Sequence, residues 1–199
     1  MLYIFDMGGV VTTTANVFGE CARRIGITEE DFISYARGTK GKGDSYGDMI
    51  KGASDGDFST KELWKIFEER SGIRVKTDWL HYLFHPEYIK GTRRLVALLK
   101  SQGNRVVCGT NTIDSHYHNH LERGDYTVFD QTYASCFMGV SKPDVEFWKI
   151  ILSAENANPE DAVFIDDREE NVNAARSLGI KSYLFTDAFT LAKELDIKL

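Results

Sequence analysis

The stretch that decides the fold is MLYIFDMGGVVT, residues 1–12. The four apolar residues at positions 2–5 predict a central strand of a parallel sheet, and Asp6 follows that strand directly. Gly8 and Gly9 predict a turn after the carboxylate. Because ligands of open α/β sheets bind at the carboxyl ends of the strands, we place the chemistry at Asp6. Taken alone, these residues do not exclude a simpler interpretation, in which Asp6 merely caps a turn.

Three later segments of the sequence give the first one a specific functional interpretation. They are VVCGTN (residues 106–111), SKPD (141–144) and AVFIDD (162–167). The first and third predict apolar strands, one ending in a hydroxyl and an amide and the other in two carboxylates. The second places Lys142 just before a predicted helix start. Each feature by itself also fits a turn residue, a surface lysine or a helix cap, whereas all of them in this order favour a functional site.

These four segments, in this order, resemble the four motifs of the haloacid dehalogenase superfamily of phosphotransferases and phosphatases. The resemblance covers essentially the whole chain. In particular, the chain looks like the capped sugar-phosphatase branch, whose small helical cap is inserted between the first and second motifs. The resemblance implies a doubly wound parallel α/β sheet of Rossmann-like type, with the first strand between the strands of the second and fourth motifs.

The predicted organisation is a catalytic core, residues 1–13 and 89–199, with a helical cap, residues 14–88. The cap region shows helical patterning, clearest from Ser59 to Arg70, where Ser59 and Glu62 form a capping box. Beyond it, helical and strand patterns alternate, which indicates a parallel sheet with right-handed crossovers. The elements expected there are helices at 89–101, 115–122, 143–154 and 169–178, and strands at 105–109, 131–134, 162–165 and 181–185.

Phosphoryl transfer requires an aligned nucleophile, positive charge around the phosphate oxygens and a metal ion. Asp6 is the candidate catalytic nucleophile, because a carboxylate can form an aspartyl-phosphate that water then hydrolyses. By resemblance, Asp6, the main-chain carbonyl of Gly8, and Asp167 hold Mg²⁺, a cation that prefers oxygen ligands. Asp166 is then expected to orient a metal-bound water. The sequence does not decide which of the paired carboxylates coordinates the ion directly.

The expected phosphate-binding groups come from three segments of the chain. Thr110 can donate its hydroxyl to a phosphate oxygen, and Lys142 can stabilise the transition state and the covalent intermediate, so both are catalytic candidates. Backbone N–H groups at the glycine turn add further donors. The complete expected set of phosphate-binding residues is Met7, Gly8, Thr110, Asn111 and Lys142.

Gly8 departs from the family pattern, since most phosphatases of the family carry Asp at this position to protonate the leaving oxygen and later activate water. Loss of such assistance typically costs about 10²–10⁴-fold in rate. An Asp-x-Gly variant also occurs in the branch that the chain resembles, so the change does not by itself make the protein inert. We expect substrates with good leaving groups, such as anomeric sugar phosphates or acyl phosphates. Asp114 or His116 is a candidate surrogate acid.

The leading functional prediction is a Mg²⁺-dependent phosphatase acting on a small organophosphate, preferably a sugar phosphate. A second possibility is a haloacid dehalogenase, which uses the same nucleophilic Asp without metal. Paired carboxylates facing Asp6 oppose it, because they would repel one another without a cation. A third is a catalytically weak binding or regulatory protein, which the change at Gly8 favours and the retention of the other site residues opposes.

Composition narrows the partners of the protein. The net charge of −6, with dispersed Lys and Arg, disfavours nucleic acid as a partner. No apolar run approaches a membrane span, and residues 2–5 are too few for a signal peptide. The three cysteines lack metal-type spacing, so reduced thiols in a cytoplasmic setting are expected. Oligomeric state is left open, and the expected partner is a small phosphorylated substrate.

Some further polar residues allow two interpretations. The three histidines at positions 116, 118 and 120 predict an exposed polar helix rather than a zinc site, because further ligands are not evident nearby. Asn171 either orients the lysine or metal groups or is a surface amide. The cap loop also carries polar residues that either contact a sugar or form a solvated acidic loop: Asp44, Tyr46, Asp48, Asp55 and Asp57.

Overall fold

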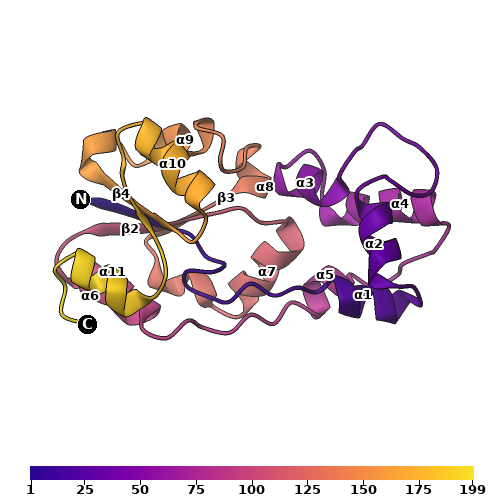
Figure 1. Ribbon diagram of the computed structural model, residues 1–199, viewed down its shortest axis with the longest axis horizontal. Coiled ribbons are helices and arrows are strands. Elements are labelled where there is room, and N and C mark those ends of the chain that lie inside the picture. The colour runs from indigo at the N-terminus through magenta and orange to yellow at the C-terminus, as the bar shows by residue number, and fades with distance from the viewer.

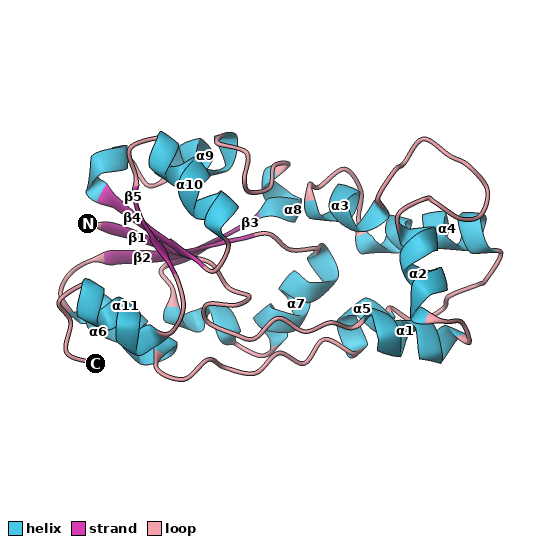
Figure 2. Cartoon of the chain, viewed as in Figure 1, coloured by secondary structure: helices cyan, strands magenta, loops and turns pink.

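A five-stranded parallel sheet forms the centre of the core in the computed structural model, which describes residues 1–199 (Figures 1 and 2). The strands are β1 (Leu2–Phe5), β2 (Arg105–Thr110), β3 (Gln131–Ala134), β4 (Ala162–Asp166) and β5 (Lys181–Leu184). Their order is β3-β2-β1-β4-β5, and every neighbouring pair is parallel. The predicted doubly wound sheet is confirmed, with the first strand between those of the second and fourth motifs.

The register of the sheet brings the motif residues to one edge. Phe5 on β1 lies opposite Cys108 on β2 and Ile165 on β4. Because the strands are parallel, the residues that follow these three positions leave the sheet at the same carboxyl edge. Asp6 and Asp166 are the first such residues on their strands, and Thr110 comes two residues after Cys108.

Side chains alternate between two apolar layers, one on each face of the sheet. On β1, Ile4 packs in one layer and Phe5 in the other. The layer around Phe5 includes residues of α6 (Thr92–Ser101) and α11 (Ala188–Glu194). The layer around Ile4 includes residues of α9 (Glu146–Ala154) and α10 (Glu169–Ser177). Figure 2 shows these helix pairs on opposite faces, so both faces of the sheet are covered.

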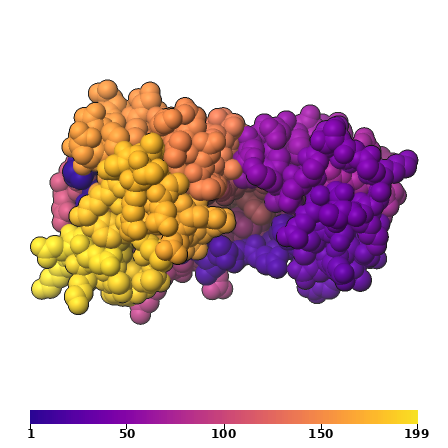
Figure 3. Space-filling model, turned by 45° about the horizontal axis from the view of Figure 1, so that its top comes forward, coloured from indigo at the N-terminus to yellow at the C-terminus, as the bar shows by residue number.

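The region between β1 and α6 is helical and lies beyond the carboxyl edge of the sheet (Figure 1). Its helices are α1 (Phe18–Ile25), α2 (Glu29–Ala36), α3 (Met49–Ser54), α4 (Thr60–Ser71) and α5 (Trp79–Tyr82). Helix α4 has the predicted capping box between Ser59 and Glu62. A separate apolar cluster around Phe32 and Phe67 holds these helices together. Figure 3 shows the region as a lobe of its own, which we call the cap, and its boundaries at residues 14 and 88 stay a prediction.

Two predicted helix starts in the core differ from the structure by three residues. The helix expected from residue 89 begins at Thr92, after Gly91 in the left-handed conformation. The helix expected from residue 143 begins at Glu146, whose N–H donates to the Asp144 side chain. In both cases local turn chemistry delays the helix. The remaining elements are α7 (Asp114–Glu122), η1 (Asp125–Val128), α8 (Ser135–Met138) and η2 (Pro159–Asp161).

Helix α7 corrects the expectation of an exposed polar helix. His120 and Asn119 are buried, and only His118 of the three histidines is exposed. The helix packs against α5 of the cap, where His81 Nδ1 lies 3.0 Å from the Ser115 carbonyl oxygen. The polar sequence hides this burial because the partners of α7 are themselves polar or aromatic.

None of the helices in the structure combines the length and apolar character needed to cross a bilayer.

Candidate active site

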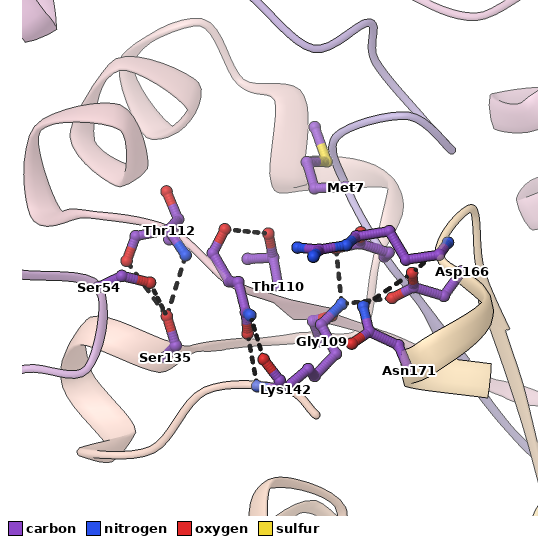
Figure 4. Close-up of polar contacts among 12 residues, drawn as sticks. Met7, Ser54, Gly109, Thr110, Thr112, Ser135, Lys142, Asp166 and Asn171 are labelled. Atoms are coloured by element: carbon purple, nitrogen blue, oxygen red, sulfur yellow. Dashed lines mark hydrogen bonds and ion pairs between the residues drawn. The ribbon is translucent and has the colours of Figure 1, made fainter. Parts of the chain in front are cut away.

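Lys142 lies at the centre of a buried charge cluster at the carboxyl edge of the sheet. Its Nζ is 2.9 Å from Asp6 Oδ1 and 2.7 Å from Asp166 Oδ2, and it donates to the Gly109 carbonyl at 2.9 Å (Figure 4). The lysine is 4% exposed, Asp6 8% and Asp166 not at all. Three segments far apart in the sequence therefore supply one ammonium group and two carboxylates that water barely reaches.

The loop that carries Lys142 is held by Asn111. The Asn111 amide accepts a hydrogen bond from the Lys142 N–H and donates one to the Lys142 carbonyl, both at 2.8 Å. These two bonds tie the end of β2 to the loop and set the direction of the lysine side chain. The structure thus gives Asn111 contacts that position Lys142, while its predicted contact with phosphate stays a prediction.

The paired carboxylates after β4 occupy different environments. Asp166 Oδ1 accepts hydrogen bonds from Asn171 Nδ2 and the Arg168 N–H, both at 2.9 Å, and its Oδ2 pairs with Lys142. Asn171 is buried and therefore positions Asp166 rather than lying on a helix surface. Asp167 is more exposed and lies against Gly9, where an added Cβ would come within 2.1 Å of Asp167 Oδ2. Glycine at position 9 leaves room for this carboxylate.

The three carboxylates can share a cation. One oxygen from each of Asp6, Asp166 and Asp167 lies within 4.8 Å of the others. Oxygen donors of this kind suit Mg²⁺. Because both oxygens of Asp166 already accept hydrogen bonds, the less engaged oxygens belong to Asp6 and Asp167. The donor set therefore fits the metal ion that the family pattern implies.

The charges of the cluster are mutually dependent. Burial raises the pKa of Asp6 to about 6; the Asp166 charge adds to this effect and Lys142 opposes it. Burial by itself would lower the pKa of Lys142, but the two carboxylates outweigh it and the pKa is raised. Burial and the Asp166 charge also raise the pKa of Asp167. A single lysine thus faces three carboxylates, and an added cation would relieve their repulsion.

A cavity of about 190 Å³ opens beside this cluster. It is lined by Met7, Gly8, Thr13, Thr14, Ala15, Phe84, Thr110, Asn111, Thr112, His116 and His120. Of the predicted phosphate-binding residues, all but Lys142 line it directly. A larger cavity of about 450 Å³ lies between α4, α5 and α7; of the predicted residues only Asp114, a candidate surrogate acid, lines it, and none of the predicted phosphate or metal ligands does. The space next to Gly8 is therefore the candidate substrate pocket.

Comparison with known families identifies the family to which the chain belongs. The sequence model of a family described as haloacid dehalogenase-like hydrolases matches residues 1–179. The chain belongs to the haloacid dehalogenase-like hydrolase family. It is therefore a hydrolase, and the matched range includes all four segments at the sheet edge.

Individual members of the haloacid dehalogenase-like hydrolases give the degree of similarity. Sesquiterpene phosphatase astK of Aspergillus oryzae is 28% identical over 200 residues, which are 96% of this chain and 93% of the relative. Flavin mononucleotide hydrolase 1 of Arabidopsis thaliana is 41% identical, but over 32% of this chain and 26% of its own. The chain thus resembles one curated phosphatase along nearly its whole length.

Solved structures of the family have the same architecture. A Bacteroides thetaiotaomicron enzyme of the family, in complex with magnesium and inorganic phosphate, superposes with a TM-score of 0.76 at 21% identity, over 94% of each chain. A predicted hydrolase of the family from Porphyromonas gingivalis superposes with a TM-score of 0.78 at 20% identity, over 99% of this chain and 98% of that one. At such identities the likeness establishes the fold.

Several pocket residues of this haloacid dehalogenase-like hydrolase have no motif that would reveal them. Phe84 and His120 line the pocket, yet neither belongs to the four motifs. The signal for His120 is its spacing of four residues from His116, which puts both rings on one face of α7. For Phe84, near the end of the cap segment, the sequence offers no comparable signal. Asp114 does not line the pocket, because its Oδ1 accepts a hydrogen bond from the Thr60 N–H of the cap at 2.9 Å.

Proposed function

We propose that the protein is a Mg²⁺-dependent phosphatase that hydrolyses a small organophosphate, preferably a sugar phosphate, through an aspartyl-phosphate on Asp6. The observation that carries the proposal is the contact of one buried lysine with two buried carboxylates, with a third carboxylate at the rim. Such a cluster supplies a nucleophile, a fixed positive charge and oxygen ligands for a cation within a few ångströms. These are the parts that phosphoryl transfer requires.

The reaction divides into two steps on this chain's own residues. An Asp6 carboxylate oxygen attacks phosphorus, the bond to the leaving oxygen breaks, and the phosphoryl group becomes attached to Asp6. The leaving oxygen keeps the bonding electrons and takes a proton from solvent. Water then attacks phosphorus and gives up a proton to solvent, the bond to Asp6 breaks, and inorganic phosphate leaves. Lys142 and the Thr110 hydroxyl stabilise the charge on the transferring group in both steps.

Asp6, the Gly8 carbonyl and Asp167 are the proposed metal ligands, with Asp166 oriented behind them by Lys142 and Asn171. When bound, Mg²⁺ would neutralise charge on the phosphate oxygens next to the nucleophile. The magnesium and phosphate bound to the related Bacteroides thetaiotaomicron enzyme support this choice of ion. The Aspergillus oryzae relative, named as a sesquiterpene phosphatase, supports phosphate ester hydrolysis.

A catalytically weak binding protein is the second candidate function, and Gly8 is the observation that favours it. No side chain extends from this position toward a leaving group. The intact charge cluster opposes it, since a protein without catalysis has no need for a buried lysine between two carboxylates. A metal-independent dehalogenase is opposed by the three carboxylates, which lack a counter-charge beyond Lys142.

A screen of phosphate esters tests the proposal. The wild-type protein is assayed with Mg²⁺ and with a chelator, beside Asp6→Asn and the exposed control Asp161→Asn. We expect phosphate release that needs Mg²⁺, is lost by at least about 10³-fold in Asp6→Asn, and is retained in the control. Halide release from a 2-haloacid that survives chelation would favour the dehalogenase. Absence of Asp6-dependent release from every substrate would favour the binding protein.

A further inference from the structure

Helix α7 directs two imidazole rings at the pocket next to Gly8. His116 and His120 lie one helical turn apart and both line the pocket. The ring of His116 stacks on Phe84 with centroids 3.9 Å apart and an interplanar angle of 9°. His120 meets the same Phe84 ring edge to face at 5.0 Å. Phe84 from the cap segment therefore holds both rings in fixed orientations.

The ring nitrogens of His120 have distinct roles. Nδ1 lies 2.7 Å from Asp125 Oδ2, and the same carboxylate accepts hydrogen bonds from Arg123 Nε at 2.9 Å and from the Tyr88 hydroxyl. Despite its burial, these partners lower the pKa of Asp125, so it is a carboxylate and can only accept. His120 Nδ1 must then carry the proton. Its Nε2 is left as an acceptor with a free lone pair.

His116 has a polar atom without a partner. Its Nε2 is buried and makes no hydrogen bond. A buried polar atom is destabilising unless a ligand or water satisfies it. Burial lowers the pKa of His116 to about 3, although the Leu80 carbonyl beside the ring acts in the opposite direction. Burial also lowers the pKa of His120, so both rings are neutral near pH 7. Neutral rings can exchange hydrogen bonds with uncharged groups, whereas they hold no proton to transfer as an acid.

The groups around the two rings argue against a metal site at this position. The charged neighbours of His120 are Asp125 and Arg123, and those of His116 are the imidazoles of His120 and His81. None of them supplies a second metal ligand, because the cluster that could hold a cation consists of the carboxylates at the sheet edge. The rings instead offer hydrogen-bonding atoms on an aromatic wall, which is what a hydroxylated carbon skeleton requires.

Resting on the phosphatase function proposed above, we propose that His116 and His120 form the leaving-group subsite and hydrogen-bond hydroxyl groups of the substrate. Gly8 lines the same space and adds no side chain to it. The pair selects polyhydroxylated phosphates, such as hexose phosphates, over phosphates whose leaving group has no hydroxyl. Neither ring acts as the missing acid, so selection of a good leaving group at Gly8 and selection of hydroxyl groups at α7 act together.

His116→Phe tests the subsite, because it keeps the ring that stacks on Phe84 and removes both nitrogens. The kcat/KM for a hexose 1-phosphate is compared with that for acetyl phosphate, which has no hydroxyl group. We expect the ratio of the two to fall about tenfold, the size of one lost hydrogen bond, mainly through a higher KM for the sugar. His118→Gln, on the exposed face of the same helix, keeps the wild-type ratio. An equal loss on both substrates would show a structural role and overturn the proposal.

A binding measurement separates this inference from the proposed function. Calorimetry of hexose 1-phosphate with Asp6→Asn, in the presence of Mg²⁺, gives a Kd that does not depend on turnover. Adding His116→Phe should raise this Kd about tenfold, and an unchanged Kd overturns the subsite. If acetyl phosphate is hydrolysed while hexose phosphates neither bind nor react, the phosphatase stands and the subsite fails. If nothing is hydrolysed but the Kd shifts as expected, the subsite stands and the phosphatase fails.

Discussion

At the scale of single residues, Gly8 is the position that distinguishes this site from most of its family. Its backbone lies outside the left-handed region, and a Cβ added there would meet only the Thr14 methyl group, at an ordinary 3.6 Å. The fold therefore does not require glycine at position 8, in contrast to Gly9, whose φ of 80° and contact with Asp167 exclude a side chain. Glycine at position 8 therefore changes the chemistry of the site, and packing does not require it.

Gly8→Asp should consequently restore leaving-group protonation. We expect kcat for hexose 6-phosphates, whose alkoxide is a poor leaving group, to rise at least about tenfold, with a smaller change for hexose 1-phosphates. Gly8→Asn, which has the same shape but no proton to give, is the control. Steady-state kinetics on the two substrates measures the effect. A wild-type preference for 6-phosphates would contradict the leaving-group argument from the outset.

His116 links the pocket to the pH dependence of stability. Its folded pKa of about 3 lies below the ordinary 6.5, so between these values the unfolded chain takes up a proton that the folded protein does not. Stability from this group is fully present above pH 6.5 and is lost as pH falls. Between about pH 7 and pH 5, the wild type should lose about 2 kcal/mol more than His116→Phe. Urea unfolding at both pH values measures this difference; parallel losses would mean that the folded ring is protonated.

At the scale of elements, the cap loop before α3 is fixed by one buried arginine. Arg70 of α4 is bonded to Asp44 at 2.6 and 2.8 Å and to the carbonyls of Tyr35, Ala36 and Gly47. The sequence left open whether Asp44 contacts a sugar, and the structure instead pairs it with this arginine. The acidic cap residues separate further, since Asp48 caps α3. Asp55 contacts the core, where it accepts a hydrogen bond from Ser141, next to Lys142.

Arg70→Met should release this loop. The substitution leaves a carboxylate and three carbonyls without their donor, so the free energy of unfolding should fall by about 3 kcal/mol. Amide exchange of residues 38–47 should accelerate, while β1 and β4 keep their protection. Arg74→Met, at an exposed position of the cap, is the matched control. Unchanged exchange in the loop would mean that backbone contacts alone hold it.

At the scale of the whole molecule, the cap contacts the core along two lines, one where α3 meets α8 and one where α4 and α5 meet α7 (Figure 1). On one side, Ser54, the last residue of α3, lies 3.2 Å from Ser135 of α8, hydroxyl to hydroxyl (Figure 4). On the other side, Thr60 is bonded to Asp114, and Asp78 accepts a hydrogen bond from Ser115. These contacts are polar, and each contributes only about 1 kcal/mol. Together with the stacking of Phe84 on His116 and the packing of Ile113 in the cap cluster, these bonds hold the cap against the core.

Replacing the cap residues that donate or accept hydrogen bonds along these two lines should let the cap move away from the core. Ser54→Ala with Thr60→Val keeps side-chain size and deletes one hydroxyl on each side, so the open population should rise about 10–30-fold. Limited proteolysis of the segments that connect cap and core should become faster by a similar factor. Thr39→Val, which deletes a hydrogen bond within the cap, should leave cleavage there unchanged. Equal cleavage of both variants would show that apolar contacts dominate closure.

The position of the charge cluster follows from local sequence pattern, whereas the order of the strands was implied by the resemblance to the family. An apolar run that ends in a carboxylate, a hydroxyl or a pair of carboxylates can be recognised within six residues of sequence. Parallel strands bring such ends to one edge of the sheet whatever surrounds them. Asp6, Thr110 and the pair after β4 could therefore be named from the sequence, as could Lys142 by resemblance. The capping box at Ser59 is equally local, and it was predicted with the correct residues.

The remaining features of the site depend on burial and on contacts between residues that are far apart in the sequence. The sequence of α7 predicts an exposed helix, but Phe84, Asp125 and the cap convert two of its histidines into pocket walls. Asp166 and Asp167 are indistinguishable as neighbours in sequence, and only the donors around Asp166 separate their roles. What the sequence by itself determined was the fold and the kind of chemistry, because short-range pattern controls both. Which polar groups are free to meet a substrate was settled only by tertiary structure, since hydrogen-bond partners come from distant segments.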